Sequence, residues 1–337
     1  MVILMERESS YIPELGEFVI AHQSDIPPGS VNEINKILTT IKLASKVVSL
    51  EISRYASFSI SEIEAMTDLE QLAQNKFIEG FRNRETVAGV ATAGMDGFLD
   101  FGGEARNRQF VVNIHPLDGS SGSEFNNVET NVSVGTVFAI YRRVSPIGGP
   151  VELRDFLQPG KNIIAAGYVL FGSSVLLMYS SGSGLHGFTL DTSLGSFLLS
   201  HPDQKMPTDG KIYSIDGGRR AKFPQGIKDY ITYCQDNIFS LRYIGSLIAD
   251  IHRNLLKGGI FLYPPTFKDP KPSVSMVFQC AAIAYITEQA GGKASDGHTR
   301  LLDLQPKTLH DRVVFICGSK AMVEKAEAFF QQSPKFG

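Results

Sequence analysis

The segment Pro116-Leu117-Asp118-Gly119-Ser120-Ser121 combines the residue types that can hold a phosphate group. It follows QFVVNI, an apolar run that is typical of a strand. An acidic residue at the end of a strand can bind a metal ion. The glycine and the two serines after it offer backbone N–H groups and hydroxyls to an anion. The same letters also fit an ordinary Asp-Gly-Ser turn, so the segment alone leaves both interpretations open.

The elements around this segment fall into two halves. Residues 31–54 carry apolar side chains at helical spacing, residues 69–81 predict a second helix, and strand-like segments follow. After the Pro/Asp/Gly-rich connector at 201–211, helical and strand-like segments alternate, which predicts a second layered α/β unit. We therefore expect two domains, residues 1–200 and residues 201–337.

Composition argues against several classes of partner. The 337 residues carry a net charge of −3, which gives no electrostatic reason to bind nucleic acid or an anionic membrane. No apolar run is long enough to span a bilayer, and the first residues do not have the pattern of a signal peptide. Three dispersed cysteines in apolar surroundings are typical of buried thiols in a reducing compartment. We expect a cytoplasmic protein without nucleic-acid or membrane partners.

Several long motifs occur in an order that resembles the class I fructose-1,6-bisphosphatases over nearly the whole chain. They are LGEFVIAHQ, PLDGSS, NVSVGTVFAIYRR, FLQPG, AAGYVLFGSS, GLHGFTLDTSLGSFLLS, RYIGSLIADIHRNLLKGGIFLYP, EQAGGKASDG and RLLDLQP. The resemblance implies a two-domain layered α/β/α sugar-phosphatase fold and a homotetramer. It also implies hydrolysis of fructose 1,6-bisphosphate to fructose 6-phosphate and phosphate, a step of gluconeogenesis, with two or three Mg²⁺-type ions.

Most of the family's metal-binding acids match neutral residues or histidine in this chain. The replaced positions are Ala93, Gly94, His115 and Gln279. Asp118 is retained, and Glu70 matches the family's catalytic aspartate. Hard cations depend on the number of charged oxygen ligands, so we expect weak or no Mg²⁺ binding. We therefore expect a pseudoenzyme, inactive or strongly impaired, that acts as a sugar-phosphate-binding or regulatory assembly subunit.

An active sugar-bisphosphate phosphatase with a rebuilt metal site is the alternative. His115 and Asp118 could hold a softer ion such as Zn²⁺ or Mn²⁺. Other acids could also move in, namely Asp96, Glu104, Glu124 and Glu129. The loop that leads to NVSVGT is about five residues longer than the family pattern, a change that costs little closure entropy. We expect that this loop distorts the pocket for the 1-phosphate.

The resemblance also assigns residues that bind the sugar phosphate. They are Gly119, Ser120, Ser121, Asp216, Arg242, Tyr243 and Tyr263. In the family the arginine reaches across from a neighbouring subunit, so Arg242 could serve an active paralogue in a mixed oligomer. Asp216 replaces an asparagine and Ser273 a lysine, and both changes disfavour a phosphate dianion. Arg219 and Arg220 could compensate.

The family's allosteric AMP site is matched only weakly. Glu33, Asn35 and Arg142 stand at matching positions. The family's Lys-Tyr pair is replaced by Gln109 and Phe110, which removes partners for both the base and the phosphate. The sequence leaves open whether AMP still binds.

Overall fold

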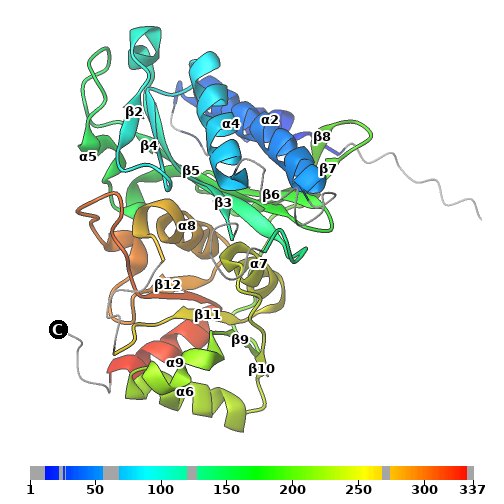
Figure 1. The fold of residues 1–337 in the computed structure, drawn as a ribbon, viewed down its shortest axis with the longest axis vertical. Helices are drawn as coiled ribbons and strands as arrows, with labels where there is room; N and C mark the ends of the chain where they lie inside the picture. The colour runs from blue at the N-terminus through cyan, green and yellow to red at the C-terminus, as the bar shows by residue number, and fades with distance from the viewer. Residues whose placement is uncertain are drawn as a thin grey trace, which may run out of the picture.

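The computed structural model describes residues 12–22, 26, 28–55, 68–119, 127–267 and 274–331. Five layers stack in the order helices, sheet, helices, sheet, helices (Figure 1). The first sheet has eight strands in the order β2-β1-β3-β4-β5-β6-β7-β8, and the second has five in the order β10-β9-β11-β13-β12. This arrangement confirms the layered α/β fold predicted from the sequence.

The first sheet is antiparallel apart from the parallel pair β1–β3. Its strands are β1 (Gly89–Thr92), β2 (Phe98–Asp100), β3 (Phe110–Asp118), β4 (Val134–Arg142), β5 (Ile163–Phe171), β6 (Val175–Ser180), β7 (His186–Asp191) and β8 (Ser196–His201). Strands β3 and β4 are buried along nearly their whole length. Burial on both faces explains why their sequences are almost continuously apolar.

Three helices cover the outer face of the first sheet. They are α1 (Leu15–Ala21), α2 (Val31–Tyr55) and α4 (Leu69–Asn83). Helix α2 buries Ile34, Ile37 and Ile41, which the sequence places at helical spacing. Both predicted helices, 31–54 and 69–81, are confirmed.

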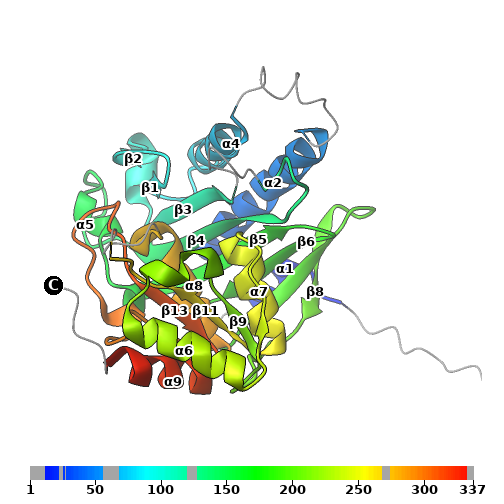
Figure 2. The same ribbon diagram turned by 60° about the horizontal axis from the view of Figure 1, so that its bottom comes forward.

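The second sheet lies between two helical layers. Its strands are β9 (Ile212–Ser214), β10 (Ser240–Leu241), β11 (Ile260–Tyr263), β12 (Lys293–Ser295) and β13 (Phe315–Gly318). The helices between the sheets are α7 (Leu247–Lys257) and α8 (Ala281–Gln289). Helices α6 (Gln225–Asp236) and α9 (Lys320–Gln331) pack together on the outer face (Figure 2).

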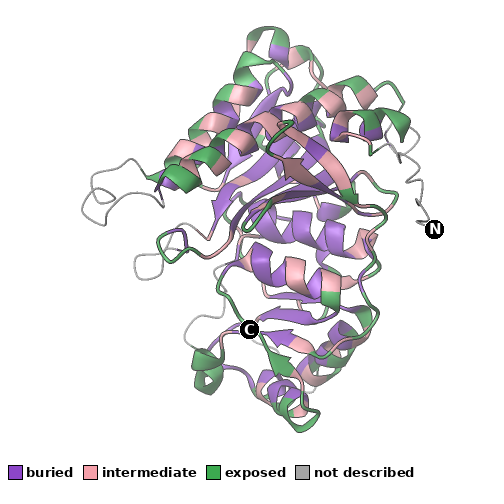
Figure 3. Cartoon of the chain, turned by 90° about the vertical axis from the view of Figure 1, so that its right-hand side faces the viewer, coloured by how far each residue is buried: buried purple, intermediate pink, exposed green. Residues whose placement is uncertain are grey.

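The middle helical layer joins the two sheets through one core. This layer is largely buried (Figure 3), and α8 is buried from Ala281 to Thr287. One apolar cluster includes Val137 of β4, Ile283 of α8 and Phe315 of β13. The expected boundary between residues 200 and 201 falls at the last residue of β8, before β9. That the two parts are separate domains stays a prediction.

Short helices occupy several connections. They are α5 (Leu153–Phe156), the 3₁₀ helices η2 (Gly103–Asn107), η3 (Gly160–Asn162), η4 (Gly217–Lys222) and η6 (Leu301–Asp303), and the π-helical turn η5 (Met276–Cys280). No helix in the described ranges is long and apolar enough to cross a membrane.

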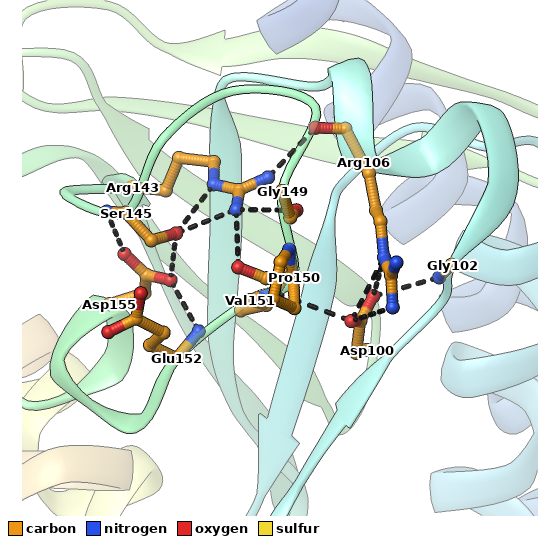
Figure 4. Close-up of polar contacts among 10 residues, drawn as sticks. All are labelled: Asp100, Gly102, Arg106, Arg143, Ser145, Gly149, Pro150, Val151, Glu152 and Asp155. Atoms are coloured by element: carbon orange, nitrogen blue, oxygen red, sulfur yellow. Dashed lines mark hydrogen bonds and ion pairs between the residues drawn. The ribbon is translucent and has the colours of Figure 1, made fainter.

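A buried polar network fixes the connection between β4 and α5 (Figure 4). The Asp155 carboxylate accepts hydrogen bonds from the backbone N–H groups of Val144 (2.7 Å), Ser145 (2.8 Å) and Glu152 (2.8 Å) and from the Ser145 hydroxyl (2.6 Å). The Arg143 guanidinium donates to the same hydroxyl and to three backbone carbonyls. Burial would raise the pKa of Asp155, but these hydrogen bonds lower it. The buried charges are thus satisfied internally, which indicates a structural role.

Candidate functional site

Asp118 is the last residue of strand β3, and an irregularity in this strand sets the direction of the Asp118 side chain. The register between β3 and β4 shifts between His115 and Asp118, and the Thr136 hydroxyl donates to the Pro116 carbonyl at 2.7 Å. Residues three apart face opposite sides of a regular strand, whereas a bulge re-aims them. His115 and Asp118 consequently line one cavity of about 270 Å³.

Both sheets and the layer between them contribute to this cavity. Its lining includes His115, Asp118, Gly119, Tyr243, Tyr263 and Gln279. A second, smaller cavity of about 30 Å³ shares both tyrosines. Its lining also includes Asp216, Arg219 and Thr266. The structure thus brings together Asp118, Gly119, Asp216, Tyr243 and Tyr263 of the predicted binding residues.

Gln279 lies on the π-helical turn η5, and two partners orient its side-chain amide. The Ser275 backbone N–H donates to Gln279 Oε1 at 3.0 Å. This contact directs the amide NH₂ to Asp118, where Nε2 donates to Oδ1 at 2.5 Å. Both side chains are buried. A neutral donor therefore stabilises the carboxylate at the position where the resemblance expects a second acid.

Two buried polar atoms of this cavity have no hydrogen-bond partner among the described residues. They are Asp118 Oδ2 and His115 Nδ1. Burial raises the pKa of the Asp118 carboxyl, while His115, Gln279 and the backbone N–H groups of Ile248 and Leu247 act in the opposite direction. Buried polar atoms are rarely left unsatisfied, so this pair is a candidate for contact with a ligand.

Among the described residues that line the smaller cavity, Arg219 is the cationic one. Arg219 Nε forms an ion pair with Asp216 Oδ2 at 2.8 Å. Arg220 instead donates to the Thr232 hydroxyl at 2.9 Å, on helix α6. Burial, with neighbouring charges, raises the pKa of Tyr243 to about 12, so its phenol is protonated at neutral pH and can donate. Of the two arginines considered from the sequence, Arg219 is the one positioned beside the tyrosines.

Other residues expected in the metal site lie outside the cavity lining. Glu70 is in the first turn of α4, and Ala93 packs against the apolar core. Gly94 is exposed, and a Cβ at this position would come 2.6 Å from Gln74 Oε1. That oxygen already accepts a hydrogen bond from the Thr92 hydroxyl at 2.7 Å. Gln74 therefore occupies the space into which an acid at position 94 would project.

The acids considered for a rebuilt site have other positions. Glu104 accepts a hydrogen bond from the Asn107 amide at 3.0 Å, and Glu129 accepts one from the Tyr55 hydroxyl at 3.4 Å. Asp96 is exposed. Within the described ranges, no group of three or more His, Cys, Asp or Glu is placed to hold a metal ion. The predicted residues outside the described ranges are Ser120, Ser121, Glu124 and Ser273.

The residues expected at the allosteric site are linked through Gln109. Glu33 accepts hydrogen bonds from the Gln109 backbone N–H (3.2 Å) and from its Nε2 (3.1 Å). Arg142 Nη1 donates to Gln109 Oε1 at 2.6 Å, and its Nη2 donates to the Ser30 hydroxyl at 3.1 Å. Asn35 lies instead beside helix α1. Gln109 thus forms hydrogen bonds within the chain to both oxygens of the Glu33 carboxylate and to Nη1 of Arg142.

Arg242 is exposed and stands apart from both cavities. Its Nη1 donates to the carbonyl of the adjacent Leu241 at 3.0 Å. The structure therefore does not bring Arg242 to the site within a single chain.

Sequence reasoning missed Asp250, which holds the segment that carries Tyr243. Asp250 is fully buried and accepts hydrogen bonds from the backbone N–H groups of Ile244 (2.9 Å) and Gly245 (3.3 Å). Arg253 forms an ion pair with it at 2.7 Å. The Asp-x-x-Arg spacing within IADIHR was the available signal, because residues three apart are neighbours on a helix.

The two stacked sheets with a polar cavity between them have the fold of the layered α/β sugar phosphatases. Family models match nearly the whole chain: the fructose-1-6-bisphosphatase N-terminal domain over residues 14–202 and the C-terminal domain over residues 206–331. The chain belongs to the fructose-1,6-bisphosphatase family.

Solved structures agree with this assignment. The chain is similar to the holo form of Leishmania major fructose-1,6-bisphosphatase, with a TM-score of 0.85 and 30% identity. That match covers 95% of this chain and 99% of the other. The T-state of the same enzyme matches with a TM-score of 0.85 and 30% identity over 96% of this chain and 99% of the other. The predicted resemblance and fold are both confirmed.

Proposed function

We propose that this chain binds a fructose phosphate and hydrolyses fructose 1,6-bisphosphate poorly or not at all. The hydrogen bond from Gln279 to Asp118 is the observation that supports the proposal most directly. Two acids at these positions would repel each other unless cations lay between them. An amide donor instead stabilises the Asp118 carboxylate without a cation.

The donor set around Asp118 does not fit a cluster of Mg²⁺ ions. Mg²⁺ requires oxygen ligands in near-octahedral geometry. The described residues of the cavity offer one carboxylate, the imidazole nitrogen of His115, and an amide whose oxygen already accepts from Ser275. Without such ions, nothing of equal strength would acidify the attacking water or offset the negative charge that grows at phosphorus. Losing even one such stabiliser typically costs about 10²–10³-fold in rate.

Binding needs less from the site than hydrolysis does. The phenols of Tyr243 and Tyr263 and the guanidinium of Arg219 can hold an anion at the smaller cavity. Asp216 partly neutralises Arg219, so we expect weak binding.

We infer that Arg242 acts between subunits of an oligomer. Leu241 and Ile244, close to it in the chain, are also exposed, as is typical of a contact surface. A homotetramer like that expected for the family would place Arg242 near a neighbouring site, and a mixed oligomer would lend it to an active paralogue. Co-purification from cells distinguishes the two, since a strictly homomeric assembly argues against the mixed oligomer.

Cys234, Cys280 and Cys317 are buried free thiols, in keeping with the expected cytoplasmic location.

Phosphate release from fructose 1,6-bisphosphate tests the proposed impairment. The purified protein is assayed with Mg²⁺, Mn²⁺ or Zn²⁺ beside an active family member prepared in the same way. We expect turnover at least about 10³-fold below an ordinary kcat of about 10 s⁻¹. Turnover near that ordinary value with any of the three ions would contradict the proposal and favour a rebuilt metal site.

A further inference from the structure

Three buried polar atoms around the larger cavity lack hydrogen-bond partners among the described residues. They are His115 Nδ1, Asp118 Oδ2 and Ser246 Oγ. Ser246 lies between the lining residues Gly245 and Leu247, and its Oγ is 3.6 Å from where a Cβ on Gly119 would be. A buried polar group without a partner has lost its hydrogen bonds to water, so a ligand that pairs with these atoms gains binding free energy.

The chemistry of these atoms suits hydroxyl groups. A carboxylate oxygen accepts from a hydroxyl, a serine hydroxyl can donate or accept, and an imidazole nitrogen does one or the other according to its tautomer. The Gln279 amide is fixed beside Asp118. Tyr243, Phe261 and Tyr263 supply aromatic walls. A volume of about 270 Å³ is close to the lower end of the range for small-molecule sites.

Charged side chains are distributed unequally between the two cavities, which share Tyr243 and Tyr263 in their linings. The larger cavity contains the Asp118 carboxyl, whereas Arg219 lies in the smaller one. The ion pair with Asp216 uses Arg219 Nε, and a guanidinium has four further N–H donors. Tyr243 and Tyr263 line both cavities, so one ligand could contact Asp118 in the larger cavity and Arg219 in the smaller one.

We infer that this site selects a sugar carrying a single phosphate, with its hydroxyls at Asp118 and its phosphate beside Arg219, over the corresponding bisphosphate. This inference rests on the proposed function and names the preferred ligand of the same site. A second phosphate would bring close to two negative charges next to Asp118, where the described cavity lining contains no lysine or arginine to offset them. The bisphosphate therefore loses affinity at the larger cavity, while the monophosphate keeps its hydroxyl contacts.

Calorimetric titration with fructose 6-phosphate and fructose 1,6-bisphosphate, with a chelator present, tests the preference. We expect the monophosphate to bind at least about tenfold more tightly to the unaltered protein. Tighter binding of the bisphosphate, equal affinities, or no binding of either would overturn the inference. This comparison needs no variant, so it does not depend on the folding of an altered cavity.

Two substitutions locate the source of the preference. Asp118→Asn removes the charge and keeps the size, so bisphosphate affinity should rise about tenfold and the preference should shrink. Asp216→Asn is the matched control. It removes the ion-pair partner of Arg219 in the smaller cavity, so the affinity for both ligands should rise by a similar factor. An unchanged preference in folded Asp118→Asn protein would overturn the assignment of Asp118.

The outcomes also separate this inference from the proposed function. Phosphate release near an ordinary rate with divalent ions would defeat the proposed impairment. Tighter bisphosphate binding without turnover would defeat only the ligand preference.

Discussion

The side-chain amide of Gln279 has two different neighbours, a backbone N–H of Ser275 on its oxygen and the Asp118 carboxylate on its nitrogen. A carboxylate in the same place would accept from Ser275 equally well, but its second oxygen would face Asp118. Glutamine presents an NH₂ group to Asp118 where glutamate would present an oxygen. This difference determines whether a hydrogen bond stabilises the pair or a cation is needed. His115 adds an imidazole rather than a further acid.

Gln279→Glu is expected to make the protein depend on divalent ions for part of its stability. Without metal, two buried carboxyl groups would destabilise the fold by about 1–3 kcal/mol at neutral pH. Added Mg²⁺ or Mn²⁺ should recover part of the loss, as measured by thermal unfolding with and without the ion.

Gln158→Glu provides a matched control for that variant. The buried Gln158 amide donates to the carbonyls of Arg142 and Asp155, so the substitution also removes amide donors. It should lower the unfolding temperature without recovery by metal. An unfolding temperature of Gln279→Glu that does not respond to metal would contradict the account of this pair.

A second residue-scale prediction concerns His252, whose Nδ1 is hydrogen-bonded to the Tyr168 hydroxyl at 2.8 Å. Burial, with His201 nearby, lowers the pKa of His252 from 6.5 to about 4. Between these values the unfolded chain binds more protons than the folded protein, so stability should fall as pH falls through this window. The loss should approach roughly 3 kcal/mol. His252→Gln should flatten the dependence of unfolding free energy on pH, and equal slopes in the two proteins would contradict this assignment.

At the scale of elements, helix α7 positions the site through its first two turns. Its Asp250 accepts two N–H groups of the preceding segment, and Arg253 also donates to the Arg242 carbonyl at 3.1 Å. The bulge in β3 and the π turn before α8 position the other two walls. Each of these local irregularities directs one side chain to the cavity.

Asp250→Asn is expected to loosen the segment that carries Tyr243. The amide can accept fewer hydrogen bonds and leaves Arg253 without its counter-charge, which should cost about 2–3 kcal/mol. Hydrogen exchange at the Ile244 and Gly245 amides should accelerate about tenfold or more. Glu288→Gln, which breaks an ion pair with Arg300 outside the cavity lining, is the matched control. If exchange at these two amides changes equally in both variants, Asp250 has no specific positioning role.

The helices and strands were largely predictable because their apolar periodicity is strong, as in α2 and β4. The sequence also supplied Asp118, Tyr243 and Tyr263 through motif resemblance. It could not show that Gln74 fills the space beside Gly94 or that Gln109 joins Glu33 to Arg142. Those contacts join segments far apart in the chain, and spacing along one sequence carries no signal for them.

At the scale of the whole molecule, two sheets share one buried helical layer. Residues of the first sheet such as Ala166 belong to the same apolar cluster as Phe261 and Phe315 of the second sheet. The cavity also takes residues from both sheets. Relative displacement of the sheets would consequently disturb the core and the site together.

This shared core predicts that the C-terminal part does not fold alone. A fragment covering residues 206–331 would expose the face of α8 that packs on β5, an apolar area whose burial stabilises the intact protein. Its amide NMR spectrum should show poor dispersion, and adding the fragment 14–202 should restore a dispersed spectrum. A dispersed spectrum for the isolated fragment would support two independent domains instead.

The cavity at Asp118 is expected not to assemble a cluster of divalent ions. The most direct measurement is anomalous diffraction at the manganese edge from crystals soaked with Mn²⁺ and fructose 1,6-bisphosphate. We predict no ordered Mn²⁺ within coordination distance of Asp118. Two ordered ions beside this carboxylate would contradict the account.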